Sequence, residues 1–233
     1  DLGEQGRKRA AVIVATSERP ATERRRAAMT ATAAAEAFRD QGLNTLLLLA
    51  SATRIARALR EIGLAAGEPP VRRGFPPSTF ARLPRLVERA GRNAQGSITA
   101  IYTVLVEGDD DNADPVADEL RSLLDGHIIL SRKLAQSGHF PAIDILRSKS
   151  RVMDAVTKID QQSQARQLNG WMSKLDDIEL LVQVGEYAAG GDPMADAALA
   201  AKDNINSFLQ QKPDDHSDFG TTRQALAALV GAP

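Results

Sequence analysis

Residues 43–83 read LNTLLLLASATRIARALREIGLAAGEPPVRRGFPPSTFARL, and this stretch decides the fold. It opens with the consecutive leucines 46–49, which follow the turn residue Gly42. An apolar run of this length is too short to cross a bilayer and is typical of a strand buried on both faces of a parallel sheet. An amphipathic helix follows at residues 55–64, with its apolar residues on one face. A buried strand followed directly by a helix indicates an α/β fold.

The carboxyl end of this predicted strand is where we expect the functional site. Open α/β sheets bind their ligands beyond the carboxyl ends of the strands. Small and hydroxylic residues followed by one cation occupy these positions, namely Ala50, Ser51, Thr53 and Arg54.

A proline-rich loop at residues 68–77 follows the helix. Proline fixes φ and removes a backbone donor, so we expect this loop to be stiff and unpaired rather than another strand. From the residues alone, Phe75 is equally compatible with an exposed and a buried position. The centre of the loop is formed by Arg73, Gly74, Phe75 and Pro76.

Outward from this stretch, hydrophobic periodicity predicts the remaining elements. We expect strands at residues 10–15, 97–106 and 127–131, and helices at residues 21–39 and 115–124. From about residue 161 the apolar residues recur at helical spacing only. The acidic residues between 107 and 111 lack the ligand spacing of an EF-hand loop, so a solvated turn explains them at least as well as metal binding.

Composition excludes several classes of protein. The chain has 233 residues and a formal net charge of −1, so no global basic field indicates nucleic acid as a partner. It has no cysteine, which excludes a disulfide framework and a cysteine metal site. Neither a signal-peptide core nor a long apolar segment is present, so we expect a soluble protein that reaches membranes only through partners.

Four stretches, in the right order along the chain, resemble the type III secretion ATPases and their flagellar export relatives. That family is similar in turn to the catalytic subunits of F-type and V-type ATPases. The stretches are residues 46–91, 96–110 (GSITAIYTVLVEGDD), 114–135 (DPVADELRSLLDGHIILSRKLA) and 139–153 (HFPAIDILRSKSRVM). The resemblance implies an incomplete RecA-like P-loop ATPase core, α/β with a mostly parallel sheet and flanking helices, over residues 1–160. It implies a C-terminal α-helical domain over residues 161–233.

The resemblance also implies roles for residues near the predicted strand end. Arg54 matches an arginine that contacts the terminal phosphate of the nucleotide in its own subunit, with a salt bridge at the strand end as the alternative. Ser51 and Thr53 accompany it as nucleotide-binding positions. Ala50 stands where the family has the Walker B aspartate, which supports Mg²⁺ through its water shell. The alanine side chain can neither accept a hydrogen bond nor offset the charge of the ion, and no residue here is expected to bind the metal directly. If the substitution is natural, we expect Mg²⁺ binding and turnover to fall, and if it is engineered, it would slow the motor deliberately. A misread register is the third possibility, although Ser51, Thr53 and Arg54 fix the register well.

A second cation, Arg151, matches the arginine finger that reaches into the neighbouring subunit's site. An ordinary surface arginine after a strand is the alternative, and the nearby Lys149 could share the role. In the family, the loop with Arg73, Gly74, Phe75 and Pro76 faces the central channel of a hexameric ring, where a stalk protein would touch it.

The function that the resemblance implies is ATP hydrolysis, with ATP and Mg²⁺, in a homo-hexamer that exports unfolded effector proteins. The helical tail would receive secretion chaperones and effectors, and the ring would be cytoplasmic and peripheral at the inner-membrane export apparatus. The GxxxxGK[ST] phosphate loop lies outside these residues, so we expect a C-terminal fragment that is inactive alone. The alternative is a non-hydrolysing scaffold or regulatory subunit of the same fold that docks chaperone–cargo complexes, and Ala50 is its main support.

Overall fold

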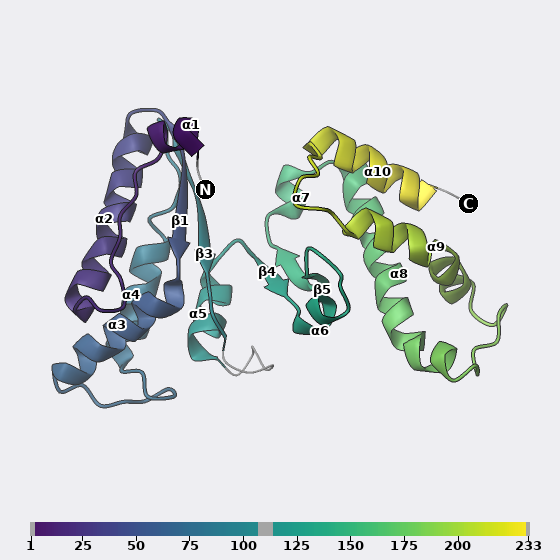
Figure 1. Ribbon diagram of the computed structural model, residues 1–233, viewed down its shortest axis with the longest axis horizontal. Helices are drawn as coiled ribbons and strands as arrows, with labels where there is room; N and C mark the ends of the chain where they lie inside the picture. The colour runs from purple at the N-terminus through teal and green to yellow at the C-terminus, as the bar shows by residue number, and fades with distance from the viewer. Residues whose placement is uncertain (1–2, 107–113, 232–233) are drawn as a thin grey trace. The chain divides into compact units, whose positions relative to one another are not determined.

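The computed structural model describes residues 3–106 and 114–231. The chain divides into two compact units, Asp1–Leu124 and Asp125–Pro233. The first unit combines helices with a small sheet, and the second combines a β-hairpin with helices (Figure 1). The acidic residues between 107 and 111 lie outside the described part of the chain. None of the described helices is long and apolar enough to cross a membrane.

The sheet of the first unit confirms the predicted parallel pairing. Strand β1 (Asn44–Ala50) runs parallel to β3 (Ser97–Thr103), and β2 (Gly91–Arg92) pairs antiparallel with β3 on its other side. In the parallel pair, Ala50 lies opposite Thr103, so the two strands end together. The helices of this unit are α1 (Gly3–Lys8), α2 (Ala21–Asp40), α3 (Ala52–Ala65), α4 (Pro77–Val87) and α5 (Pro115–Leu123).

Only one face of this sheet is buried, so the prediction of a strand buried on both faces was wrong. Leu47 and Leu49 are buried against the helices, which lie along one side of β1 and β3 (Figure 1). Leu46 and Leu48 point to the opposite face and are 59% and 65% exposed. The four leucines make both faces of the strand apolar, but a face is buried only where another element of the structure covers it.

The strand expected at residues 10–15 is absent from the structure. Val12 and Val14 are exposed, and no described strand pairs with this segment. β-branched residues favour strands only where a neighbouring strand supplies the ladder hydrogen bonds, so composition alone misjudged it.

The proline-rich loop was expected to be unpaired, but the structure shows that it is paired. Arg72 and Phe75 form an isolated antiparallel bridge, and the Phe75 N–H donates to the Arg72 carbonyl at 2.9 Å. Arg73 and Gly74 between them both have positive φ, at 46° and 82°. Positive φ at both central residues is the signature of a type I′ turn, so the loop is a tight hairpin turn.

The second unit begins with an antiparallel hairpin and continues as helices. Strands β4 (Gly126–Leu130) and β5 (Ile143–Ser150) pair, with α6 (Arg132–Gln136) between them. The predicted helical character from about residue 161 is confirmed by the three longest helices of this unit. The helices that follow the hairpin are α7 (Met153–Val156), α8 (Ile159–Gln183), α9 (Pro193–Leu209) and α10 (Phe219–Gly231).

The core of the second unit is formed by Leu168 and Trp171 of α8 with Ala198 and Ile205 of α9. These are the residues that the helical spacing places on one face. The compact units divide between residues 124 and 125, which differs from the boundary expected between 160 and 161. Compactness and family membership are different criteria for a domain, so that boundary stays a prediction.

Candidate functional site

The first part of the site lies where β1 passes into α3. Ala50 ends the strand, and Ser51 is the N-cap of the helix, because its side-chain oxygen accepts the Arg54 N–H at 3.4 Å. A serine at this position is among the strongest helix-start signals. The free N–H groups and the dipole of a helix N-terminus favour a negative charge beside them.

Thr53 is buried and serves the fold. Its Oγ1 accepts the Leu105 N–H at 2.8 Å and donates to the Leu105 carbonyl at 3.3 Å. These two hydrogen bonds fix the first turn of α3 to the segment that follows β3. The predicted nucleotide-binding role of Thr53 stays a prediction, but this geometry commits its hydroxyl to the backbone.

Arg54 is exposed on the first turn of α3, beyond the carboxyl end of β1. No salt bridge joins it to a carboxylate within residues 3–106 and 114–231. The alternative explanation, a salt bridge at the strand end, is therefore not observed in the described chain. An exposed guanidinium beside a helix N-terminus suits a phosphate group, because both features favour a multiply charged anion.

A divalent cation does not fit the residues around this strand end. Position 50 offers a methyl group, and the hydroxyls of Ser51 and Thr53 already accept backbone N–H groups. Mg²⁺ prefers carboxylate, phosphate and water oxygens in an octahedral shell. Among the described residues, no cluster of three or more acidic or histidine side chains could hold a metal ion. These residues therefore present a cation that suits a phosphate group, and no carboxylate that suits a metal ion.

The second predicted cation, Arg151, lies just after β5 in the second unit. Its backbone N–H donates to the Asp125 carbonyl at 2.7 Å, and the residue is exposed. The backbones of β4 and β5 approach each other closely here, since a Cβ at Gly126 would lie 2.5 Å from the Lys149 carbonyl oxygen. The start of β4 and the end of β5 thus hold the backbone of Arg151 in place.

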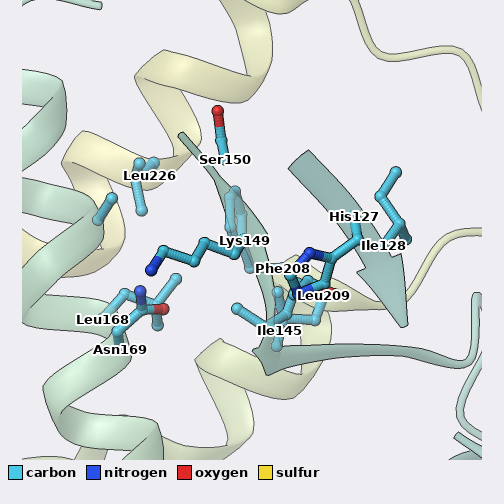
Figure 2. Close-up of a pocket in the computed structure, with 12 residues that line it drawn as sticks. His127, Ile128, Ile145, Lys149, Ser150, Leu168, Asn169, Phe208, Leu209 and Leu226 are labelled. Atoms are coloured by element: carbon cyan, nitrogen blue, oxygen red, sulfur yellow. The ribbon is translucent and has the colours of Figure 1, made fainter. Parts of the chain in front are cut away.

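Lys149 lies on the same strand but lines a cavity. Figure 2 shows its side chain extending from β5 toward Asn169 of α8. The cavity measures about 370 Å³ and is bounded by the hairpin and by α8, α9 and α10. Arg151 is not among its lining residues, so the structure gives the two cations different surroundings. The cavity was not predicted from the sequence, because its lining combines strand residues with helical residues whose spacing is that of a packed core.

The third predicted group, Arg73, Gly74, Phe75 and Pro76, is the turn between α3 and α4. Phe75 is half-buried, which answers the question that the sequence left open. The guanidinium carbon of Arg60 lies 5.4 Å from the centroid of its ring. Arg60 was not among the site residues predicted from the sequence. The sequence signal that could have identified Arg60 is the arginine-rich face of α3, which is followed along the chain by a turn that contains a glycine and an aromatic residue.

Comparisons with known proteins identify what the chain resembles. The family model described as "ATP synthase alpha/beta family, nucleotide-binding domain" matches residues 1–150. The model described as "T3SS EscN ATPase C-terminal domain" matches residues 157–228. A type 3 secretion system ATPase of Sinorhizobium fredii is 57% identical over 229 residues, which are 98% of this chain and 51% of that protein.

Solved structures agree with these matches. The assembled ATPase EscN of enteropathogenic E. coli superposes with a TM-score of 0.90 at 52% identity, over 93% of this chain and 52% of that one. EscN in complex with its central stalk EscO gives a TM-score of 0.86 at 51% identity, over the same shares of the two chains. The chain therefore spans about half the length of the relatives that it matches.

Proposed function

The chain belongs to the ATP synthase alpha/beta family, in its branch of type 3 secretion ATPases, and we propose that it forms part of an ATP-hydrolysing subunit of a protein secretion apparatus. The observation that carries this proposal is the position of Arg54. It is an exposed cation on the first turn of α3, directly beyond the parallel strands β1 and β3. That edge is where open α/β sheets bind nucleotides.

In this proposal, Arg54 contacts the terminal phosphate of ATP in its own subunit. Arg151 acts as an arginine finger on the nucleotide of a neighbouring subunit in a homo-hexameric ring. A planar, permanently charged guanidinium suits both roles, since it stabilises the charge that develops on the transferred phosphoryl group. Phosphoryl transfer also uses Mg²⁺, but Ala50 leaves no carboxylate at this strand end, so these residues contribute no metal ligand.

The partners follow from the same family. The EscN structure with its central stalk EscO supports a stalk protein as a partner of a ring of these subunits. In this proposal, the stalk touches the turn at Arg73, Gly74, Phe75 and Pro76. Secretion chaperones and unfolded effectors would bind the helical part. The ring would be cytoplasmic and would reach the inner membrane through the export apparatus. The phosphate loop GxxxxGK[ST] is not within these residues, so the chain alone should not hydrolyse ATP.

Mixed rings test the roles of the two arginines. In the full-length ATPase that we expect to contain this chain, Arg54→Ala and Arg151→Ala should each abolish most turnover. Loss of an arginine finger costs roughly 10³ to 10⁵ in rate. If Arg151 acts in a neighbouring subunit, mixing the two variants assembles some sites in which both arginines are intact, and partial activity returns.

The control for this experiment is Lys149→Ala, because Lys149 is a cation on the same strand that lines the cavity instead. We expect it to leave turnover near wild type. Mixed rings without activity, or full turnover by Arg151→Ala, would contradict the proposed arrangement. Loss of turnover in Lys149→Ala would indicate that Lys149 shares the role of Arg151.

A non-hydrolysing scaffold or regulatory subunit is the second candidate, and Ala50 favours it. Without the carboxylate at this position, a ring could keep its fold, its finger and its docking tail yet turn over slowly. ATP hydrolysis by full-length protein with Ala50 and with Ala50→Asp separates the two functions. A large gain from Ala50→Asp supports the scaffold for the natural chain, whereas strong turnover with Ala50 excludes it.

A further inference from the structure

We propose that Arg60 is a positioning residue that ties the nucleotide-facing end of α3 to the turn at residues 71–76. This inference rests on the proposed function, because it assigns a nucleotide to the N-terminus of α3. It adds a residue that makes the turn respond to the site by holding the turn against α3.

Arg60 holds the turn through the aromatic ring of Phe75. The guanidinium carbon lies 5.4 Å from the ring centroid, within the range of a cation–π interaction. Phe75 in turn meets Phe80 of α4 edge-on, with ring centroids 6.1 Å apart and an interplanar angle of 61°.

Arg72 completes the stack from the other side. Its guanidinium carbon lies 5.2 Å from the centroid of Phe80, and its Nη2 pairs with the Asp118 carboxylate of α5 at 3.1 Å. Two arginines therefore enclose two aromatic rings, and the stack joins α3, the turn, α4 and α5. Such a stack favours one conformation of the turn over others.

Close backbone packing adds to these side-chain contacts. A Cβ at Gly74 would lie 3.0 Å from Arg60 Nη2, so the guanidinium lies directly over the turn backbone. A Cβ at Gly63 would lie 2.6 Å from Pro76 Cγ, so the helix also touches the end of the turn. The turn thus contacts α3 at two points one helical turn apart, and it cannot move independently of the helix.

The helix between the two ends is a rigid connector. Ala56, Ala58 and Leu59 are almost fully buried between the N-terminal turn and Arg60. Arg60 follows Arg54 by six positions, which corresponds to about 9 Å along a helix axis. A displacement of the first turn on nucleotide binding is therefore expected to move Arg60 with it.

Hydrogen exchange of the turn in the full-length ATPase tests this coupling. The Val71 and Phe75 amides report the turn, because they donate to the Phe75 and Arg72 carbonyls at 3.0 and 2.9 Å. In wild type, we expect ADP and a non-hydrolysable ATP analogue to change their exchange rates to different extents. In Arg60→Ala, the two amides should exchange roughly three- to fivefold faster, as expected for loss of one exposed cation–π contact. Their response to nucleotide should be clearly smaller than in wild type, because only the contact between Gly63 and Pro76 still joins the turn to α3, while nucleotide affinity is retained.

Three further variants separate coupling from simple loosening of the turn. Arg60→Lys keeps the positive charge and should restore part of the response, whereas Phe75→Leu removes the ring from the other side of the contact and should reduce the response as much as Arg60→Ala does. Arg72→Ala should loosen the turn but keep its response, because the Arg60 contact remains. Arg85→Ala removes an exposed arginine of α4 and should change neither rate.

Two results would overturn the inference while leaving the proposed function intact. These are nucleotide binding with a wild-type turn that does not respond, and a nucleotide response in Arg60→Ala that equals wild type. A wild-type protein that binds no nucleotide would instead overturn the proposed function, and this inference with it.

Discussion

Glu36 of α2 and Arg89 form a two-pronged ion pair that joins α2 to the segment after α4. Arg89 Nε donates to Glu36 Oε1 at 2.8 Å, and a second guanidinium nitrogen donates to Oε2. The hydrogen bonds from Arg89 hold the pKa of Glu36 below its usual value of 4.5, although partial burial acts in the opposite direction. The folded state therefore binds a proton at Glu36 less readily than the unfolded chain does.

We predict that Glu36→Gln lowers the free energy of unfolding by about 1 kcal/mol at pH 7, the value of a partly exposed charged hydrogen-bonded pair. A carboxylate with a depressed pKa stabilises the fold above its unfolded pKa, and the stabilisation is lost as the pH falls through the folded pKa. The difference from wild type should thus be complete above about pH 5 and vanish in acid. Urea unfolding across this range measures it. Glu18→Gln, at an exposed residue, is the control, and an equal effect there would refute the prediction.

At this scale, the sequence predicts where the candidate residues lie along the chain but not their hydrogen-bond and ring partners. Ser51, Thr53 and Arg54 were predictable because the end of β1 and the start of α3 are adjacent along the chain. The hydrogen bonds between Thr53 and Leu105 were not predictable, since these residues are 52 positions apart in the sequence and their contact depends on how β3 ends. The contact between Arg60 and Phe75 likewise depends on the positive φ of Arg73 and Gly74.

At the scale of elements, α5 is held by a single capping residue. The Asp114 carboxylate accepts the Val116 and Ala117 N–H groups, each at 2.9 Å, and Pro115 occupies the first helical position. We predict that Asp114→Ala destabilises the first unit by about 1 kcal/mol, the usual cost of a lost N-cap. Asp114→Asn should keep most of the stability, because its amide oxygen accepts the same bonds. Thermal unfolding distinguishes the two, and equal losses would argue against capping.

Elements were predictable where a local signal was decisive. The helix expected at residues 115–124 is α5, and apolar residues at helical spacing predicted the helices of the second unit, because caps and periodicity act over a few residues. The segment at residues 10–15 failed because a strand requires a partner that local sequence cannot specify. The turn at residues 71–76 was judged by its prolines, although Arg73 and Gly74 determine its pairing.

At the scale of the whole molecule, we predict two separable unfolding transitions. Trp171, the only tryptophan of the chain, lies in the core of the second unit and reports that unit by fluorescence. Leu168→Ala should lower the stability of this transition by about 2–4 kcal/mol, the cost of a cavity at a buried leucine. Leu83→Ala empties the core of the first unit instead and should leave the tryptophan transition in place. If both variants shift it equally, the chain unfolds as one unit.

The open face of the first unit's sheet has a practical consequence for anyone who purifies this chain. Leu46, Leu48 and Ile101 are each more than half exposed there, and among the described strands β1 pairs only with β3. An unpaired strand edge beside exposed apolar side chains favours aggregation of the protein. Ammonium sulfate should therefore precipitate the protein early, since excluded salts strengthen apolar association. Leu46→Lys together with Leu48→Lys should reduce this aggregation and keep concentrated solutions of the protein clear.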